Sequence, residues 1–296
     1  MKKKKHHQRE EKLIEIALIT VSAISIFTTI AIIVTLFYES ALFFQEVSII
    51  EFFTSLRWAP VFDPPAFGVL PLLSGTLLIA VLSSLISLPL GLGSAIYLSE
   101  FASKRMRKTV KPMLELLAGI PSIVYGFFAL TFITPILRTI LPETSVYNAL
   151  SASIAVGIMT LPMVASLSED AMMSVPDSIR QGAYALGSTK LEVAINVIVP
   201  AAFSGIAASF MLAISRAIGE TMIVAIAAGQ TPTFTFNPLE SIQTMTGFMV
   251  NMALGDIQQG SIEFQTVFVV GALLFMVTLV MNFIARFVIQ KNREVY

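Results

Sequence analysis

Long runs of apolar residues, separated by short polar stretches, dominate the chain. A helix needs about 20 residues to span the hydrocarbon core of a bilayer. Six runs meet that length, and they cover residues 13–38, 68–98, 112–137, 147–167, 201–228 and 264–288. The runs at 68–98 and 201–228 exceed the length of a straight crossing, which permits tilted or broken helices. The pattern predicts an all-α polytopic membrane protein with six transmembrane helices.

Composition supports this class and narrows the chemistry. Hydrophobic residues make up 55% of the chain and charged residues 13%, whereas soluble domains carry about 25% charged residues. Cysteine is absent, and the two histidines, His6 and His7, lie in a basic tail, so we expect neither a disulfide nor a metal site. The apolar run behind that tail is too long for a signal peptide and lacks a small-residue cleavage site. We therefore expect an uncleaved first transmembrane helix.

The positions of Lys and Arg predict the orientation in the membrane. Six lie in the tail up to Lys12, five at 104–111, two at 169–199 and three near the C-terminus, together sixteen of nineteen. The opposite side has only Arg57 and Arg138. Because cytoplasmic segments carry the excess of basic residues, both termini are predicted to be cytoplasmic.

This topology divides the chain into a basic tail (1–12), a first transmembrane helix (13–38), an extracytoplasmic loop (39–67) and a transmembrane domain (68–290). The outer loops 39–67 and 229–263 contain aromatic, Pro and Gly clusters. These clusters indicate packed caps or interfacial segments, although plain connecting loops also fit. Trp58 is expected to anchor at the headgroup level.

A polar loop at about 169–199 carries a spaced motif of small residues. Gln181, Gly182 and Ala183 are followed by Gly187, and Val199-Pro200 then leads into the next apolar run. Small residues let a short helix lie close inside a groove of another protein, glycine allows a sharp turn, and proline favours a helix start. The spacing resembles the EAA loop by which permeases of ABC importers bind their ATPase, with Gln181 replacing the usual glutamate. The alternative is an ordinary amphipathic loop helix.

Two charged residues lie inside the fifth apolar run. Arg216 and Glu220 are four residues apart, so on a continuous helix they share a face and can pair. Ionisable residues within a membrane are costly and mark functional sites by default. Gly219, between them, allows a helix break or close approach of another helix. The alternative is a satisfied pair that only orients this helix in the bundle.

Proline and glycine also occur deep in two other runs. Residues 87–95 contain Pro89, Gly91 and Gly93, and residues 119–126 contain Pro121, Ser122 and Tyr125. Such residues weaken a helix and free carbonyl groups, which is tolerated where protein or water satisfies them. Ser122 and Tyr125 add hydroxyl groups to a predicted kink. Tight packing of helices through small residues is the alternative, above all for the Gly91 and Gly93 pair.

The chain contains no G-x-x-x-x-G-K-[ST] sequence, so a P-loop for ATP is absent and hydrolysis must come from another chain. It also lacks a nucleophile–base pair that would favour a membrane enzyme. We therefore expect a transport subunit that binds no cofactor itself.

Over residues 13–290 the chain resembles the permease subunits of type I ABC importers, and among them the Pst-type phosphate permeases. The sequences AGIPSIVYG at 118–126 and RAIGET at 216–221 carry the resemblance most specifically, together with LSEF at 98–101 and the loop at 181–200. The continuation after Glu220 is more similar to the C-type than to the A-type subunit.

The resemblance implies a permease that imports inorganic phosphate by alternating access in the cytoplasmic membrane of a bacterium or archaeon. It implies three kinds of partner protein: a second homologous permease, a cytoplasmic ATPase dimer that holds ATP and Mg, and an extracytoplasmic phosphate-binding protein. The chain is expected to contact membrane lipid and to bind no nucleic acid. The first helix would lie outside a core of five. Arg216 would contact the anion or gate it, with Glu220 as counter-charge and Thr221, Tyr125 and Ser122 as hydroxyl groups of the pathway. A permease for molybdate or sulfate, or a stand-alone intramembrane enzyme or sensor, are the alternatives.

Overall fold

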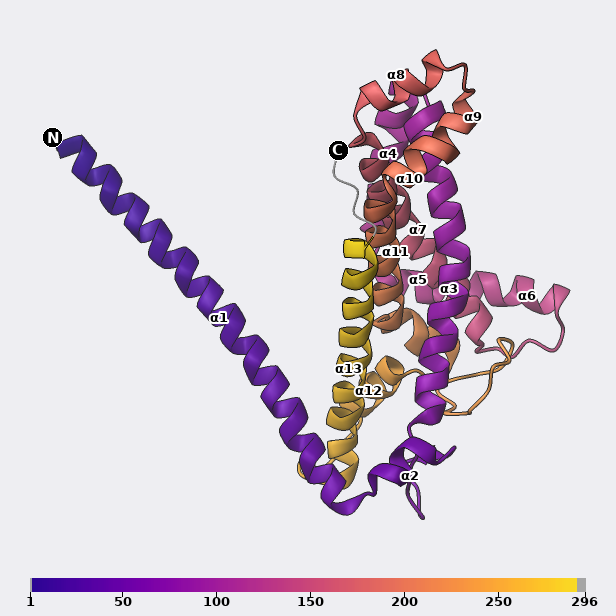
Figure 1. Cartoon of the computed structure of the whole chain (residues 1–296). Coiled ribbons are helices and arrows are strands. Elements are labelled where there is room, and N and C mark those ends of the chain that lie inside the picture. The colour runs from indigo at the N-terminus through magenta and orange to yellow at the C-terminus, as the bar shows by residue number, and fades with distance from the viewer. Residues whose placement is uncertain (1, 292–296) are drawn as a thin grey trace.

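A computed structural model describes residues 2–291, and it is almost entirely helical (Figure 1). Met1 and Arg293, which belong to the predicted basic ends, lie outside the described residues. The helices are α1 (Lys2–Glu46), α2 (Ile49–Thr54), α3 (Leu70–Ile96), α4 (Lys104–Ala118), α5 (Ser122–Phe128), α6 (Thr134–Ile140), α7 (Ala149–Met173), α8 (Asp177–Ala185), α9 (Lys190–Val193), α10 (Val199–Ala201), α11 (Phe203–Ile218), α12 (Met245–Leu254) and α13 (Ile262–Lys291). The π-helical turns are η1 (Tyr97–Phe101), η2 (Ala129–Ile133), η3 (Ala194–Ile198) and η4 (Val224–Ala228). The strands β1 (Trp58–Ala59) and β2 (Ala66–Phe67) pair antiparallel.

Within residues 2–291, five helical segments are long and apolar enough to cross a membrane: Glu11–Glu46, Leu70–Phe101, Ser122–Ile140, Ala149–Met173 and Ile262–Phe287. A sixth arises if Lys190–Ala201 and Phe203–Ile218, which meet at 74°, form one bent span. This arrangement confirms the predicted all-α membrane fold, with six spans when the bent pair is counted as one.

Two predicted spans differ from the structure. The third begins at Ser122 rather than at residue 112, because residues 104–118 form the separate amphipathic helix α4 and the chain breaks at 119–121. With five basic residues, α4 is too polar for a transmembrane helix. The fifth span, predicted at 201–228, is interrupted at 219–221, where Gly219 ends α11.

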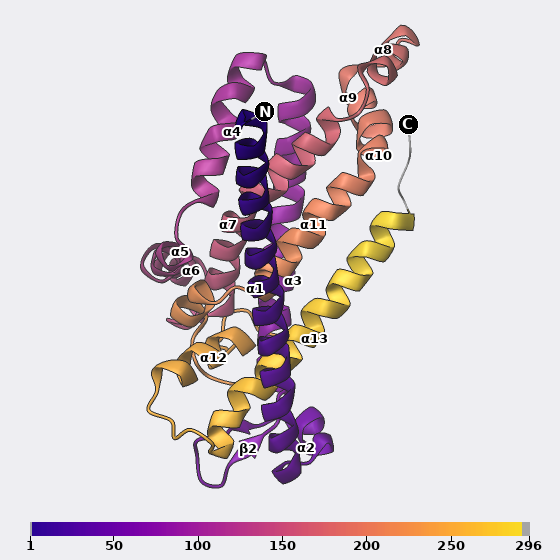
Figure 2. The same cartoon turned by 90° about the vertical axis from the view of Figure 1, so that its left-hand side faces the viewer.

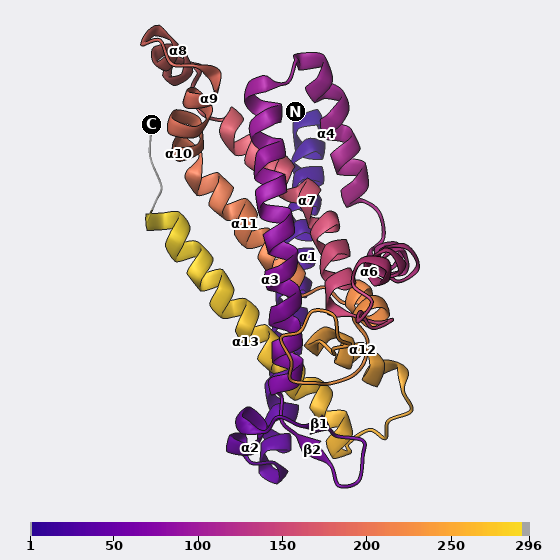
Figure 3. The same ribbon diagram turned by 90° about the vertical axis from the view of Figure 1, so that its right-hand side faces the viewer.

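Helices α3, α7 and α11 pack together at the centre of the bundle (Figures 1 and 3). The buried face of α7 consists largely of small side chains, among them Ala149, Ser151, Ala152, Ala155 and Gly157. A Cβ atom on Gly91 of α3 would lie 2.6 Å from a methyl group of Val164, whereas one on Gly93 would meet nothing within 4 Å. Gly91 is therefore a packing residue, since small residues let membrane helices approach closely.

The first outer loop is a packed cap, as one of the two interpretations predicted. It contains α2 and the β1–β2 hairpin, and its aromatic residues pack on α12. The prediction for Trp58 was wrong: its side chain is 2% exposed, with ring centroids 5.0 Å from Phe248 and 6.3 Å from Phe52. Burial in this cluster removes more apolar surface than a position at the headgroups.

The start of α1 and the helices α4 and α8 lie at one end of the molecule, opposite α2 and α12, and α13 ends in the half nearer to α4 and α8 (Figures 1 and 2). This is the end that the basic residues assign to the cytoplasm. Helix α1 leans away from the bundle and meets α13 only near the opposite end (Figure 1). Side chains at 11–32 are exposed on every face of α1, in keeping with a first helix outside the core.

Candidate functional site

Helix α8 forms an exposed tip at the end assigned to the cytoplasm and carries the motif of small residues (Figure 2). Gln181 and Gly182 are exposed, while Ala183 is partly buried against the cluster that includes Ala95 and Met172. Gly187 has φ = +86°, a conformation that L-residues rarely adopt. Its N–H donates to the carbonyl oxygen of Tyr184 over 3.0 Å. The predicted sharp turn after a short helix is confirmed.

The helix after this turn begins earlier than the motif suggested. Thr189 caps α9 with a capping box, in which its side chain accepts from the Glu192 N–H and the Glu192 carboxylate accepts from the Thr189 N–H. Helical structure then runs through η3 into α10. The prediction that Pro200 starts the next helix was therefore wrong. Pro200 lies two residues before the bend at Ala202. Proline fits there because it cannot donate a helical hydrogen bond.

Arg216 and Glu220 do not pair, contrary to the prediction from their spacing. Helix α11 ends at Ile218, so the four-residue spacing no longer places both side chains on one face. Glu220 is 8% exposed, and its Oε1 accepts from the N–H of Ile223 over 3.2 Å. Among the described residues no ion pair joins these two. The glycine between them redirects the carboxylate towards the next helical segment.

Arg216 instead lines a groove of about 270 Å³ between α4, α7 and α11. Its side chain is exposed, and its Nη2 lies 3.8 Å from the sulfur of Met159. Glu115 of α4 and Pro162 of α7 line the same groove. The structure thus leaves the guanidinium exposed in a groove that no single stretch of sequence revealed.

The predicted hydroxyl groups lie near the two helix breaks, and those of Tyr125 and Thr221 are already hydrogen-bonded. Tyr125 is buried, and its hydroxyl donates to the carbonyl oxygen of Leu117 over 2.9 Å, across the break at 119–121. Thr221 donates to the carbonyl oxygen of Gly219 over 3.1 Å. Ser122 begins α5 and is partly buried. Each of the two bonded hydroxyls stabilises a broken segment, since it satisfies a carbonyl near the break.

The two breaks are close in space. A Cβ atom on Gly126 would lie 3.2 Å from atoms of both Ile223 and Ile226. Tyr125, Ile218 and Ile223 share one buried cluster. The segments that sequence analysis singled out separately, 118–126 and 216–221, therefore meet in one region of the bundle.

Sequence analysis missed a charged cluster between α4 and α7. Glu169, with no exposed side-chain surface, pairs with Arg107 and, over 2.7 Å, with Lys111, which also pairs with Asp170. Burial opposes the charge of Lys111, but hydrogen bonds and charge attraction from Asp170 and Glu169 outweigh it and raise its pKa. The spacing of Arg107 and Lys111, four residues apart on one helix, was the available signal.

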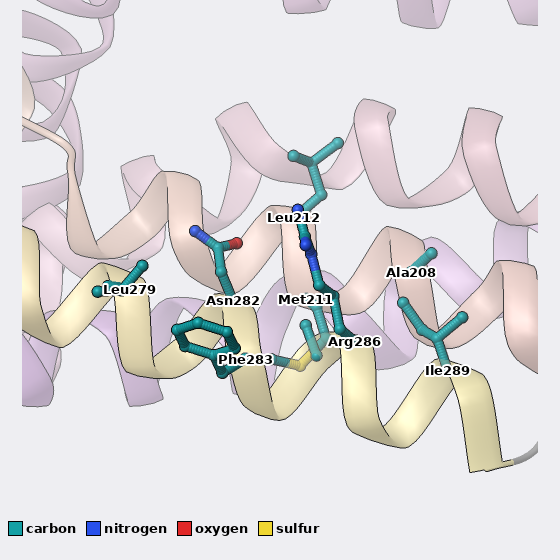
Figure 4. A pocket seen from close by; sticks show the side chains of 9 residues that line it. Ala208, Met211, Leu212, Leu279, Asn282, Phe283, Arg286 and Ile289 are labelled. Carbon is teal, nitrogen blue, oxygen red and sulfur yellow. The ribbon is translucent and has the colours of Figure 1, made fainter. Parts of the chain in front are cut away.

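A second groove opens between α11 and α13 in the half of the molecule near α8. Figure 4 shows Asn282 and Arg286 projecting from α13 beside Met211 and Leu212 of α11. Its volume is about 470 Å³. Leu212 lines both this groove and the groove that contains Arg216.

Comparison with known proteins identifies the family. Residues 87–294 match the family described as "Binding-protein-dependent transport system inner membrane component". The chain is 36% identical over 247 residues to the probable ABC transporter permease protein YqgH of Bacillus subtilis, covering 83% of this chain and 80% of that protein. It is 31% identical over 263 residues to the phosphate transport system permease protein PstC of Mesorhizobium japonicum, covering 81% and 78%.

Solved structures share the fold at lower identity. The bacterial alginate ABC transporter in complex with its pentasaccharide-bound periplasmic protein contains a chain with a TM-score of 0.65 and 18% identity, covering 94% of this chain and 93% of that chain. The inward-facing MetNI methionine ABC transporter contains one with a TM-score of 0.56 and 17% identity, covering 77% and 95%. From the sequence match and the fold together, the chain belongs to the binding-protein-dependent transport system inner membrane component family.

Proposed function

We propose that this chain is a permease subunit that carries inorganic phosphate inward across the cytoplasmic membrane by alternating access. The observation that carries the proposal is the exposed Arg216 in the groove between α4, α7 and α11. A guanidinium offers a planar fork of donors that matches oxyanions and remains charged at any physiological pH. The relatives named as phosphate permeases support phosphate as the anion.

Release of the anion requires that its binding be weak. Glu115, a carboxylate on α4, lines the same groove as Arg216. A carboxylate close to the anion's path opposes tight retention, as transport requires binding loose enough to allow release. Glu220 has another role in this proposal: it accepts a backbone hydrogen bond and holds the break at 219–221.

ATP hydrolysis is assigned to partner chains. The exposed helix α8 and the turn at Gly187 form the docking element for a cytoplasmic ATPase dimer that holds ATP and Mg, while this chain binds no cofactor. A second homologous permease would complete the groove at Arg216, and an extracytoplasmic phosphate-binding protein would deliver the anion to the end that carries α2 and α12. The breaks at 119–121 and 219–221 supply points at which the helices can bend between outward- and inward-open states.

Uptake into proteoliposomes tests the substrate. The chain would be reconstituted with its companion permease, ATPase and binding protein, and labelled phosphate, sulfate and molybdate would be compared with ATP enclosed. ATP-dependent uptake of phosphate in excess of the other two is the expected result. Preferential uptake of sulfate or molybdate would assign a different oxyanion, and substrate conversion by this chain alone would indicate an enzyme.

A further inference from the structure

A buried ion pair joins the exposed helix α8 to the end of a transmembrane helix. Arg180 directly precedes the motif at 181–187, and its Nε lies 3.3 Å from Oε1 of Glu100 in η1, at the end of α3. Both side chains are shielded, with 11% and 4% of their surfaces exposed. An ion pair this buried fixes geometry far better than a surface pair, whose charges water screens.

The same guanidinium also holds the end of α7. Its Nη2 donates to the carbonyl oxygen of Met172 over 2.6 Å, and its Nη1 donates to that of Val175 over 2.7 Å. Carbonyl groups at a helix C-terminus lack helical partners and carry partial negative charge, so a cation is favourable there. Arg180 thus connects three elements at once: α8, the end of α3 and the end of α7.

Other attachments of α8 are apolar. Ile179 and Ala183 pack against the cluster that contains Ala95, Met172 and Val175. Within residues 2–291, Arg180 makes every ion pair and side-chain hydrogen bond that joins α8 to η1, to α7 or to Val175 just beyond α7. Apolar contacts allow α8 to slide over its neighbours, whereas the planar guanidinium of Arg180, bound to oxygens in fixed positions, resists such movement.

One of the helices that Arg180 holds, α7, reaches the proposed substrate groove. Helix α7 packs on α3 along its length, and its residues Met159 and Pro162 line the groove beside Arg216. A displacement of α8 would therefore move the cytoplasmic ends of α3 and α7 as one unit and would alter the groove.

We propose that Arg180 and Glu100 are positioning residues that transmit movement of α8 to α3 and α7, a role separate from ATPase docking. This inference rests on the proposed function, since it requires that α8 receive the ATPase. Arg180→Lys keeps the charge but cannot reach the carboxylate and two carbonyl oxygens together. Glu100→Gln keeps the shape and removes the charge. Arg105→Met, at an exposed arginine of α4, is the matched control.

The experiment measures three quantities in the reconstituted importer: ATPase co-purified with the permease, ATP hydrolysed, and phosphate transported. Arg180→Lys and Glu100→Gln should retain the ATPase yet transport roughly tenfold less phosphate per ATP, the scale expected for loss of one charged hydrogen bond. Arg105→Met should match the parent protein.

An unchanged ratio of transport to hydrolysis in both variants would overturn the inference. Failure of both variants to insert as a monodisperse permease would make the pair a folding element and would overturn it as well. Gly187→Asp separates the two proposals: if that variant still binds and stimulates the ATPase, docking by α8 is wrong irrespective of the ion pair.

Discussion

The hydroxyl of Thr246 donates a 2.6 Å hydrogen bond to the backbone carbonyl oxygen of Glu220. Thr246 lies in the first turn of α12, whereas Glu220 lies in the break that follows α11. Both residues are buried. This bond fixes the outer helix α12 to the interrupted span, so the break is a supported part of the fold.

Loss of that hydroxyl should weaken the structure. Thr246→Val keeps the shape but leaves a buried carbonyl oxygen without its donor, which costs about 1–3 kcal/mol. Thermal unfolding of the purified permease should therefore shift to lower temperature. Thr246→Ser should restore most of the stability, and Thr109→Val, which removes an exposed hydroxyl on α4, should have little effect. Equal stability of the two valine variants would contradict this assignment.

Arg216 should be required for transport but not for assembly. Arg216→Gln removes the cation from the groove, and uptake of phosphate should fall to background while the permease still co-purifies with its partners. Because Arg216 and Glu220 are not paired, exchanging them (Arg216→Glu with Glu220→Arg) should not restore transport. Full uptake by the exchanged variant would show that the two form a scaffold pair after all.

The turn at Gly187 should be sensitive to both conformation and charge. An alanine at φ = +86° is strained by about 1–2 kcal/mol, and an aspartate adds a charge at the docking surface. Gly187→Asp and Ala183→Trp should insert normally but fail to retain the ATPase during purification. Gly182→Ala is the control, because alanine is also small and its added Cβ meets nothing within 4 Å. Retention of the ATPase by the aspartate variant would refute the docking role.

The cluster around Glu169 should contribute strongly to stability. Glu169→Ala leaves Arg107 and Lys111 without their buried partner, and breaking such a pair typically costs about 3–5 kcal/mol. Asp170→Asn provides the comparison, since the Asp170 side chain is 56% exposed and its pair is partly screened. In thermal unfolding, Glu169→Ala should therefore lower the melting temperature clearly more than Asp170→Asn. A larger loss for Asp170→Asn would be inconsistent with this ranking.

The orientation in the membrane is open to a direct test, since the chain has no cysteine. Single cysteines at Ser48 and Gln259, both exposed at the end that carries α2 and α12, should react with an impermeant reagent in intact cells. Cysteines at Ser103 and Ser188 should react only after permeabilisation. Labelling of the cysteine at position 188 from outside would invert the topology and remove the docking proposal.

The amino-acid sequence by itself determined the class of protein, the number of spans and the end at which the basic residues gather. These properties follow from hydrophobicity summed over about 20 residues and from charge, which need no knowledge of neighbouring segments. It also predicted the turn at Gly187, because the small-residue motif and its glycine are local signals. The spacing of Arg216 and Glu220 is also a local signal, but it predicted an ion pair that the structure does not contain, since Glu220 accepts from the N–H of Ile223 instead.

Only the tertiary structure decided where the helices break and which charges meet. Gly219 is compatible with a continuous or a broken helix, and the contact of Thr246 with Glu220 favours the break. The partner of Arg180 lies eighty residues away in the chain, so no periodicity could find it. Such long-range polar contacts are decisive wherever the fold shields them, since an unpaired charge or carbonyl there has no water to replace its partner.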